Sequence, residues 1–147
     1  MTNMGSLPGI KSVGWIYSRD IPKDTAFRAV AGLPVPLSAM NGVQENVVSL
    51  TGDAAWEADT DTEGNAEAQT VKLSFSTTDI LPVGERLSFI VVDVEDNLWL
   101  IGGCDEPGVR LSRHNVSGLP DGEKKVTGYE AQFTAPVALR KCYRSRV

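Results

Sequence analysis

The sequence predicts a mainly β protein, an antiparallel β-sandwich or barrel of about seven to nine strands with at most one or two short helices. Three observations lead to this fold class. The chain contains 14 Gly and 8 Pro in 147 residues, which interrupt almost every stretch long enough for a helix. Several short runs alternate between apolar and polar residues, with the period of two that is typical of half-buried strands. Residues that favour turns separate these runs.

The N-terminal half contains one clear strand and one helix candidate. Ile10–Ser18 is rich in β-branched and aromatic residues and predicts the first strand. Residues 24–31 are one of two short helix candidates, with Asp24 in the N-cap position. Pro34–Pro36 and residues 38–46 are expected to form an extended loop, and residues 47–58 to hold one or two more short strands.

The stretch 65–81 lacks Gly and Pro, yet it favours a strand. Every second residue in its centre is apolar, which is the pattern of a strand with one buried face: Val71, Leu73 and Phe75. We expect the end of this stretch, Thr77–Leu81, to form a single helical turn that stops near Pro82.

Two hairpins follow. Leu87–Val94 and Leu98–Ile101 are apolar runs around a short polar turn, which predicts a hairpin with a buried centre. Val109–Val116 and Val126–Ala135 flank a second turn at Leu119–Gly122. The last of these runs has one apolar face, made by Tyr129, Ala131, Phe133 and Ala135.

Length and charge pattern indicate a single β domain over residues 1–147, with a loop-rich acidic insertion near 52–67 and a basic C-terminal tail near 140–147. Between Ala29 and Val71 every charged residue is acidic: Glu45, Asp53, Glu57, Asp59, Asp61, Glu63 and Glu67. From Ala131 to Val147 every charged residue is basic: Arg140, Lys141, Arg144 and Arg146. Either these regions are simply solvated, or they meet complementary regions on neighbouring copies and orient them.

Composition also limits the partners and the compartment. The net charge of −5 disfavours nucleic-acid binding, and no apolar stretch approaches the ~20 residues that cross a membrane. The start of the chain lacks the basic and apolar regions of a secretory signal, so we expect cytoplasmic synthesis. Cys104 and Cys142 are the only thiols. A reducing compartment would keep them free, although one bridge between two late strands remains open.

Asp59–Asn65 is the string that most resembles a metal site. It matches the first half of an EF-hand loop, with acids at loop positions one, three and five and Gly64 at six. Thr70 stands where the bidentate Glu of position twelve should be. We therefore interpret the string as an exposed acidic turn and predict no metal ligand, with weak calcium binding as the alternative.

No catalytic residue and no cofactor site are predicted. His114 is the only histidine, and no spacing links it to Cys104 or to a nucleophilic serine. Gly102-Gly103 follows a strand but opens no helix, so it is not a nucleotide cradle. Among the tryptophans, Trp99 is expected in the core, and Trp56 is the best candidate for an exposed sugar-binding surface.

Three stretches carry a resemblance to a known class of proteins. They are Pro8–Val13, the hairpin Ser88–Gly102, and Tyr129–Ala135 with the Val137–Leu139 that follows. Their order is similar to that in small structural proteins of tailed phages and prophages. The resemblance implies a virion component of the tail or head–tail region, built on a β-sandwich or barrel, which works in rings or tubes of identical subunits.

We therefore expect a non-enzymatic, self-assembling structural protein, a homo-oligomer whose partners are other copies of itself and other structural proteins. It would be located in the virion if it is phage-derived. The polar segments 52–67 and 103–108 would then become ordered only on assembly. The alternative is a ligand-binding β module for carbohydrate or calcium that uses Trp56 and the 59–65 string.

Overall fold

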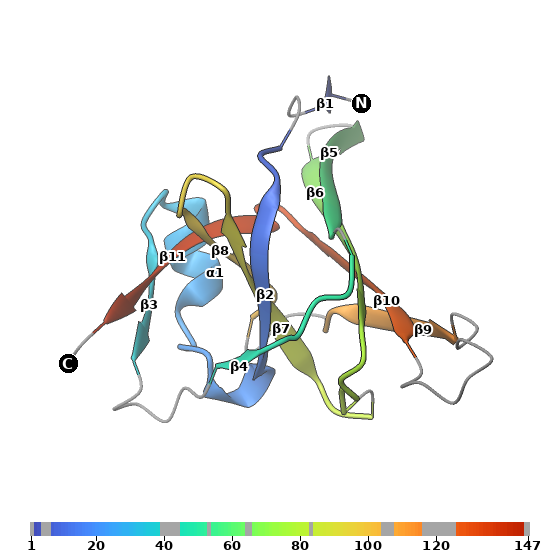
Figure 1. Cartoon of the computed structure of the whole chain (residues 1–147). Helices are drawn as coiled ribbons and strands as arrows, with labels where there is room; N and C mark the ends of the chain where they lie inside the picture. The colour runs from blue at the N-terminus through green and yellow to red at the C-terminus, as the bar shows by residue number, and fades with distance from the viewer. Residues whose placement is uncertain are drawn as a thin grey trace, which may run out of the picture.

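Two β-sheets face each other in the computed structural model, which describes residues 2–3, 7–38, 45–52, 54–63, 66–82, 84–103, 108–115 and 126–145 (Figure 1). The five-stranded sheet has the spatial order β1 (Thr2–Asn3), β5 (Ala55–Glu63), β6 (Ala66–Thr77), β10 (Thr127–Ala135) and β9 (Arg110–Asn115). The six-stranded sheet has the order β3 (Val35–Ser38), β11 (Leu139–Ser145), β8 (Leu98–Ile101), β7 (Leu87–Asp93), β2 (Ile10–Tyr17) and β4 (Asn46–Val47).

The predicted fold class is confirmed. Helical structure in the described residues is limited to the 3-10 turn η1 (Ser18–Asp20) and the short helix α1 (Thr25–Val30). Neighbouring strands are antiparallel, with the exception of the parallel pair β3 and β11. Nine of the eleven strands in the described part of the chain have four residues or more, and β1 and β4 are two-residue edge strands.

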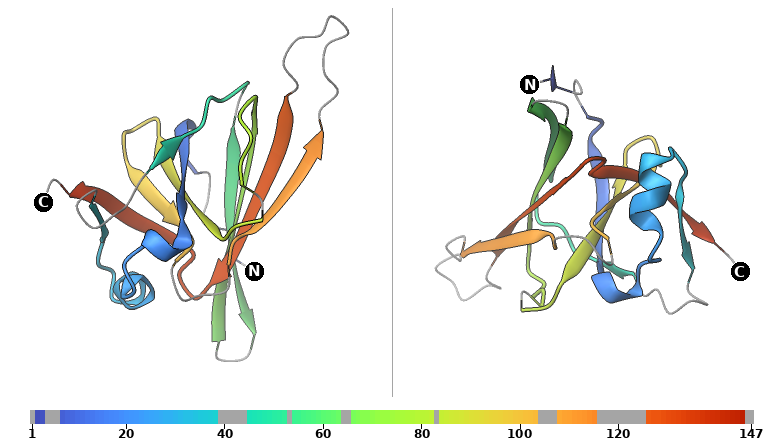
Figure 2. Two further views of the ribbon diagram at one scale, coloured as in Figure 1. Left: turned by 90° about the horizontal axis from the view of Figure 1, so that it is seen from below. Right: turned by 180° about the vertical axis from the view of Figure 1, so that it is seen from behind.

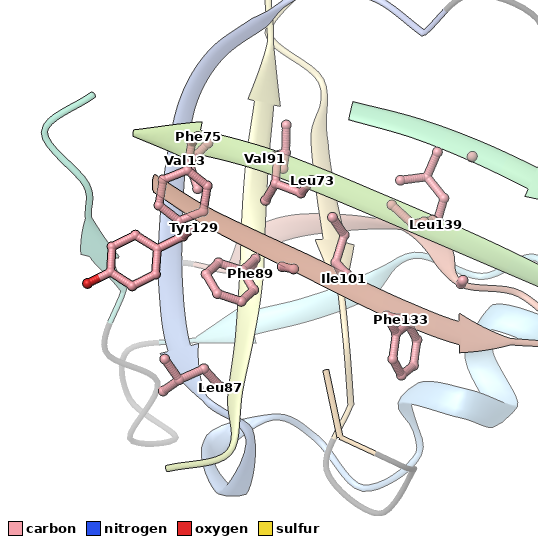
Figure 3. Packing of buried hydrophobic residues seen from close by; sticks show 14 of the residues in the cluster. Val13, Leu73, Phe75, Leu87, Phe89, Val91, Ile101, Tyr129, Phe133 and Leu139 are labelled. Atoms are coloured by element: carbon pink, nitrogen blue, oxygen red, sulfur yellow. The ribbon is translucent and has the colours of Figure 1, made fainter. Parts of the chain in front are cut away.

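The main hydrophobic core lies between the two sheets (Figure 3). Alternating residues of β6 and β10 point into it from one sheet, and alternating residues of β7 meet them from the other. Aromatic rings dominate its centre: Phe75 lies 6.0 Å from Phe89 and 5.6 Å from Tyr129 between ring centroids. Each large side chain buried in this way contributes about 1.5–3 kcal/mol to folding.

A second, smaller core covers the opposite face of the six-stranded sheet. It contains residues of β2, β3, β7, β8 and β11 together with one residue that follows η1: Ile16, Val35, Leu37, Ile90, Leu100, Cys142 and Ile21. Because β7 is covered on both faces, its residues Leu87–Val91 are buried without interruption. Burial raises the pKa of the free Cys142 thiol to about 12, with a smaller contribution from Glu45.

Both predicted hairpins are present. Leu87–Asp93 pairs antiparallel with Leu98–Ile101, and Arg110–Asn115 pairs antiparallel with Thr127–Ala135. The turn expected at Leu119–Gly122 lies outside the described residues. The helix expected over residues 24–31 forms at Thr25–Val30. Asp24 does not cap it through its side chain, because its carboxylate instead pairs with Arg28 Nε at 2.7 Å.

Four expectations about loops and turns were wrong. The loop expected at Pro34–Pro36 runs into strand β3, because Val35 and Pro36 pair with β11. The acidic stretch 52–67 is mainly strand, since β5 and the start of β6 form an antiparallel hairpin. The basic region 140–147 is not a free tail up to Ser145, because β11 pairs with β8 on one side and with β3 on the other. The helical turn expected at Thr77–Leu81 is a bend in which Thr77 Oγ1 accepts a hydrogen bond from the Asp79 amide.

Candidate interaction surfaces

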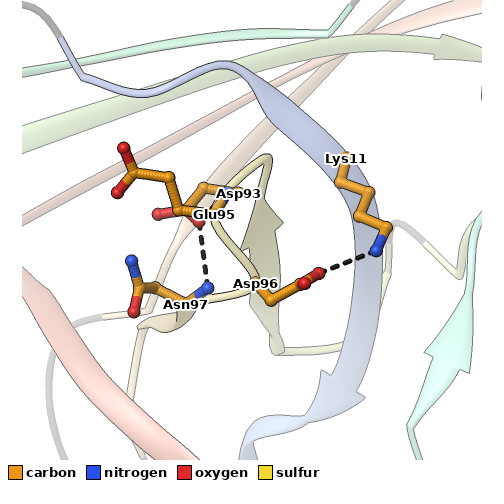
Figure 4. A network of polar contacts seen from close by, with 5 residues as sticks. All are labelled: Lys11, Asp93, Glu95, Asp96 and Asn97. Atoms are coloured by element: carbon orange, nitrogen blue, oxygen red, sulfur yellow. Dashed lines mark hydrogen bonds and ion pairs between the residues drawn. The ribbon is translucent and has the colours of Figure 1, made fainter.

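The turn between β7 and β8 holds a network of polar contacts (Figure 4). Asp93 is fully buried there, and its carboxylate accepts hydrogen bonds from the amides of Glu95 and Asn97 and from the Trp99 indole, at 2.9–3.0 Å. Burial alone would raise the pKa of Asp93, but these hydrogen bonds outweigh it, and the pKa lies below its ordinary value. With both of its carboxylate oxygens engaged by the turn and by Trp99, Asp93 acts as a structural residue.

The residues that sequence reasoning examined for chemistry are not brought together. His114 lies on β9, in register with Gly128 of β10. Asp59–Glu63 belongs to the extended strand β5, where the backbone cannot wrap around an ion as a calcium loop does. The described residues contain no group of three or more His, Cys, Asp or Glu side chains able to hold a metal ion. Cys104 lies outside the described residues.

Trp56 is less exposed than expected, whereas Trp99 packs against the main core. Trp56 is only half-exposed, packs edge-on against Trp99 at 6.2 Å between ring centroids, and donates its indole N–H to the Pro8 carbonyl at 2.7 Å. Trp99 is half-buried against the main core, and the Lys141 ammonium lies over its ring. Trp56 therefore joins the two sheets. It also lines a surface pocket of about 340 Å³ together with Glu57 and Lys72, so the carbohydrate alternative stays a prediction.

The outer side of α1 is unusually apolar for an exposed surface. Phe27, Val30 and Leu33 are 72%, 69% and 48% exposed. Phe27 and Val30 are three residues apart and therefore neighbours on one side of the helix. Leu33 follows directly after Gly32, whose positive φ of 74° turns the chain away from the helix. We call these three residues the apolar helix face, and Figure 2 shows α1 on the outside of the six-stranded sheet.

A groove lies beside the apolar helix face. Ala29, Leu33 and Pro34 line one side of it, and residues of β8 and β11 with the segment before β11 line the other: Trp99, Val137, Leu139, Arg140 and Lys141. Its volume is about 370 Å³. Arg140 is nearly buried at its base, where it donates to the carbonyls of Val137 and Gly102. The groove thus continues the apolar surface of the helix onto the sheet.

The five-stranded sheet has edges of opposite charge. Edge strand β9 carries the exposed Arg110 and Arg113 and no acidic residue. At the other edge, β5 carries acids at every second position from 57 to 63 and no basic residue. In the part of the chain that the structure describes, β1 pairs with only two residues of β5, Asp59 and Thr60. Sequence reasoning found this acidic segment but placed the opposing basic segment at the C-terminus rather than on β9.

The acidic and basic regions singled out in the sequence meet partly within one chain. Arg144 of β11 donates two hydrogen bonds to the carboxylate of Glu45, at 2.8 and 3.0 Å. The hydrogen bond with Glu45 raises the pKa of Arg144. This part of the charge pattern therefore serves the fold of the six-stranded sheet, next to its edge strand β3.

Comparison with known proteins identifies no family: no family model, no curated protein and no solved structure matches the chain. Among the described residues, no helix has the length and apolar character required to span a bilayer. The surfaces described above are thus the features from which function has to be argued.

Proposed function

We propose that this protein is a non-enzymatic structural subunit that assembles with copies of itself and with other structural proteins, as a component of the tail or head–tail region of a phage or prophage virion. The observation that carries self-assembly is the apolar helix face of Phe27, Val30 and Leu33. The assignment to a virion rests on the sequence resemblance to small phage structural proteins.

The apolar helix face supports assembly because its three side chains belong to neither hydrophobic core among the described residues. A short amphipathic helix normally turns its large apolar side chains toward the core. In α1 the buried residue is Thr25, whereas Phe27 and Val30 point to solvent. Contiguous exposed apolar side chains of this kind mark surfaces that other proteins cover. Covering each one would contribute about 1.5–3 kcal/mol to association.

The groove beside the helix enlarges this surface. A stable contact between subunits buries about 1,200–2,000 Å² in total, which three side chains alone do not provide. Trp99 and the stem of Lys141 extend the surface from α1 across β8 and β11. Aromatic side chains and long basic side chains with apolar stems are well suited to such contacts.

The test is the mass of the protein in solution as a function of concentration. We expect wild type to form oligomers, visible as a rising mass in light scattering and as regular particles by electron microscopy. The double variant Phe27→Ser/Val30→Ser should weaken association by at least about ten-fold, since each removed side chain is worth about 1.5–3 kcal/mol.

Ile80→Ser is the matched control, because Ile80 is 84% exposed and lies outside α1 and the groove. This variant should associate like wild type. A wild-type protein that stays monomeric up to millimolar concentration would contradict the proposal. So would a helix-face variant that assembles as well as the Ile80 control.

A further inference from the structure

We infer that the five-stranded sheet joins successive copies head to tail, with the basic edge strand β9 of one copy docking along the acidic strand β5 of the next. The inference rests on the proposed self-assembly and names a surface distinct from the apolar helix face. Its basis is that the five-stranded sheet has the basic strand β9 at one edge and, at the other, the acidic strand β5 next to the two-residue strand β1.

The basic edge is formed by β9. On its inner side β9 pairs with β10 from Arg110 to Asn115, and its other side has no strand partner among the described residues. Arg110 and Arg113 are exposed, and neither forms an ion pair within the described part of the chain. An unpaired edge offers backbone N–H and C=O groups to another strand, and its charges decide which strand can approach.

The acidic edge is formed by β5. Glu57 and Asp59 alternate with the inward-facing Ala58, and acids continue at positions 61 and 63. Lys72 of β6 lies opposite Glu57 and offsets only part of this charge. β1 pairs with only two of the nine residues of β5. The incoming β9 would replace β1 as the neighbour of β5.

Strand direction is compatible with this contact. Each of the steps from β5 to β6, from β6 to β10 and from β10 to β9 is antiparallel, so β5 and β9 of one copy run in opposite directions. A second copy added in the same orientation therefore brings its β9 antiparallel to β5, as in the rest of the sheet.

β5 and β9 are offset along the two strands that lie between them, β6 and β10, so they lie toward opposite ends of these strands. β5 pairs with β6 from Ala66 to Ser74, whereas β9 lies across β10 from Lys72 to Thr77 of β6. The β5–β6 and β9–β10 hairpins accordingly project in opposite directions (Figure 2). Both project beyond the body of the molecule, where a neighbouring copy can reach them. A contact between unlike faces repeats from copy to copy and produces a closed ring or a filament.

Charge reversal at each edge tests the inference. One variant, Arg110→Glu/Arg113→Glu, makes both edges acidic, and a second, Glu57→Lys/Asp59→Lys/Asp61→Lys/Glu63→Lys, makes both edges basic. At low salt each variant alone should associate at least about ten-fold more weakly than wild type. An equimolar mixture of the two should regain association, because each β9 then faces a β5 of opposite charge. The readout is oligomer mass by sedimentation velocity, at about 50 mM and about 1 M salt.

Lys11→Glu/Arg19→Glu is the matched control. It produces the same change in net charge as the β9 variant, but at exposed residues of β2 and η1. It should associate like wild type, and circular dichroism should report the same fold for all variants. Should one edge variant fail to fold, the other tests the same contact from the opposite side.

The outcomes separate this inference from the proposed function. If wild type assembles and both edge variants assemble equally well, the head-to-tail contact is wrong and self-assembly stands. If the edge variants weaken association but their mixture does not restore it, pairing between the two edges is also wrong. If wild type never assembles, both proposals fail.

Discussion

The β7–β8 hairpin and the edge strand β9 differ in how they use polar residues. In the hairpin, the single carboxylate of Asp93 is buried and accepts hydrogen bonds from three donors of its own turn. On β9, Arg110 and Arg113 are exposed and form no ion pair with the described residues. The buried carboxylate stabilises the fold of its hairpin, whereas the exposed charges of β9 would select a partner under the head-to-tail contact proposed above.

The largest effect is expected from the core beneath the hairpin. Phe89→Ala removes a fully buried ring that packs against Phe75, and it should lower the free energy of unfolding by about 3–5 kcal/mol. Urea denaturation followed by circular dichroism measures this change. Val94→Ala, at a residue of the same hairpin that is 62% exposed, should change it by less than about 0.5 kcal/mol. Equal effects of the two substitutions would show that the core is not at Phe89.

A smaller, pH-dependent effect is expected at the turn. Asp93→Asn replaces one acceptor oxygen by a donor and should cost about 1–3 kcal/mol at pH 7. The pKa of Asp93 is lower in the folded protein than the ~3.9 of an unfolded chain. The stability that the carboxylate adds is therefore complete above about pH 4 and is lost as pH falls through the folded pKa.

Urea denaturation of wild type and Asp93→Asn at pH 7 and at pH 2–3 measures this dependence. The difference between the two proteins should shrink in acid. Asp96→Asn is the control: its exposed ion pair with Lys11 should contribute less than about 1 kcal/mol. A difference that stays constant from pH 7 to pH 2 would contradict the assigned role of the Asp93 carboxylate.

The smallest effect on folding is expected at the edge. Arg113→Glu on β9 should change the free energy of unfolding by less than about 0.5 kcal/mol, because the side chain is exposed and makes no ion pair with the described residues. Urea denaturation at micromolar concentration in about 1 M salt, where association is screened, isolates this quantity. A large loss of stability would show that Arg113 contributes to folding. It would then no longer be an example of an edge charge without a role in the fold.

Much of the fold was predictable because strand patterns are local. Alternation at Val71, Leu73 and Phe75 and at Tyr129–Ala135 identified the inward faces of β6 and β10 correctly, since side chains on a strand alternate between its two faces. The β7–β8 hairpin was predictable for a similar reason: its two strands are joined by a short polar turn. The charges of the acidic segment could also be read directly.

The expectations that were wrong concern residues whose structure depends on distant partners. Residues 55–63 have a polar, acidic composition that favours a loop, but pairing with β6, itself paired with β10, makes them a strand. Leu139–Ser145 is a strand because β8 and β3 flank it, and β3 is about a hundred residues away in the sequence. Sequence reasoning likewise did not single out the apolar helix face, because it could not tell which side of α1 is covered.

By itself the sequence determined that the segments of β6 and β10 are extended and which of their faces is apolar, since both depend on the spacing of neighbouring side chains. Tertiary structure alone decided which strands stand at the edges of each sheet. It also decided that Trp56 packs against Trp99 and that α1 turns its apolar side chains outward. The physical reason is that the order of strands in a sheet, and with it the surface left for partners, depends on contacts between residues far apart in the chain.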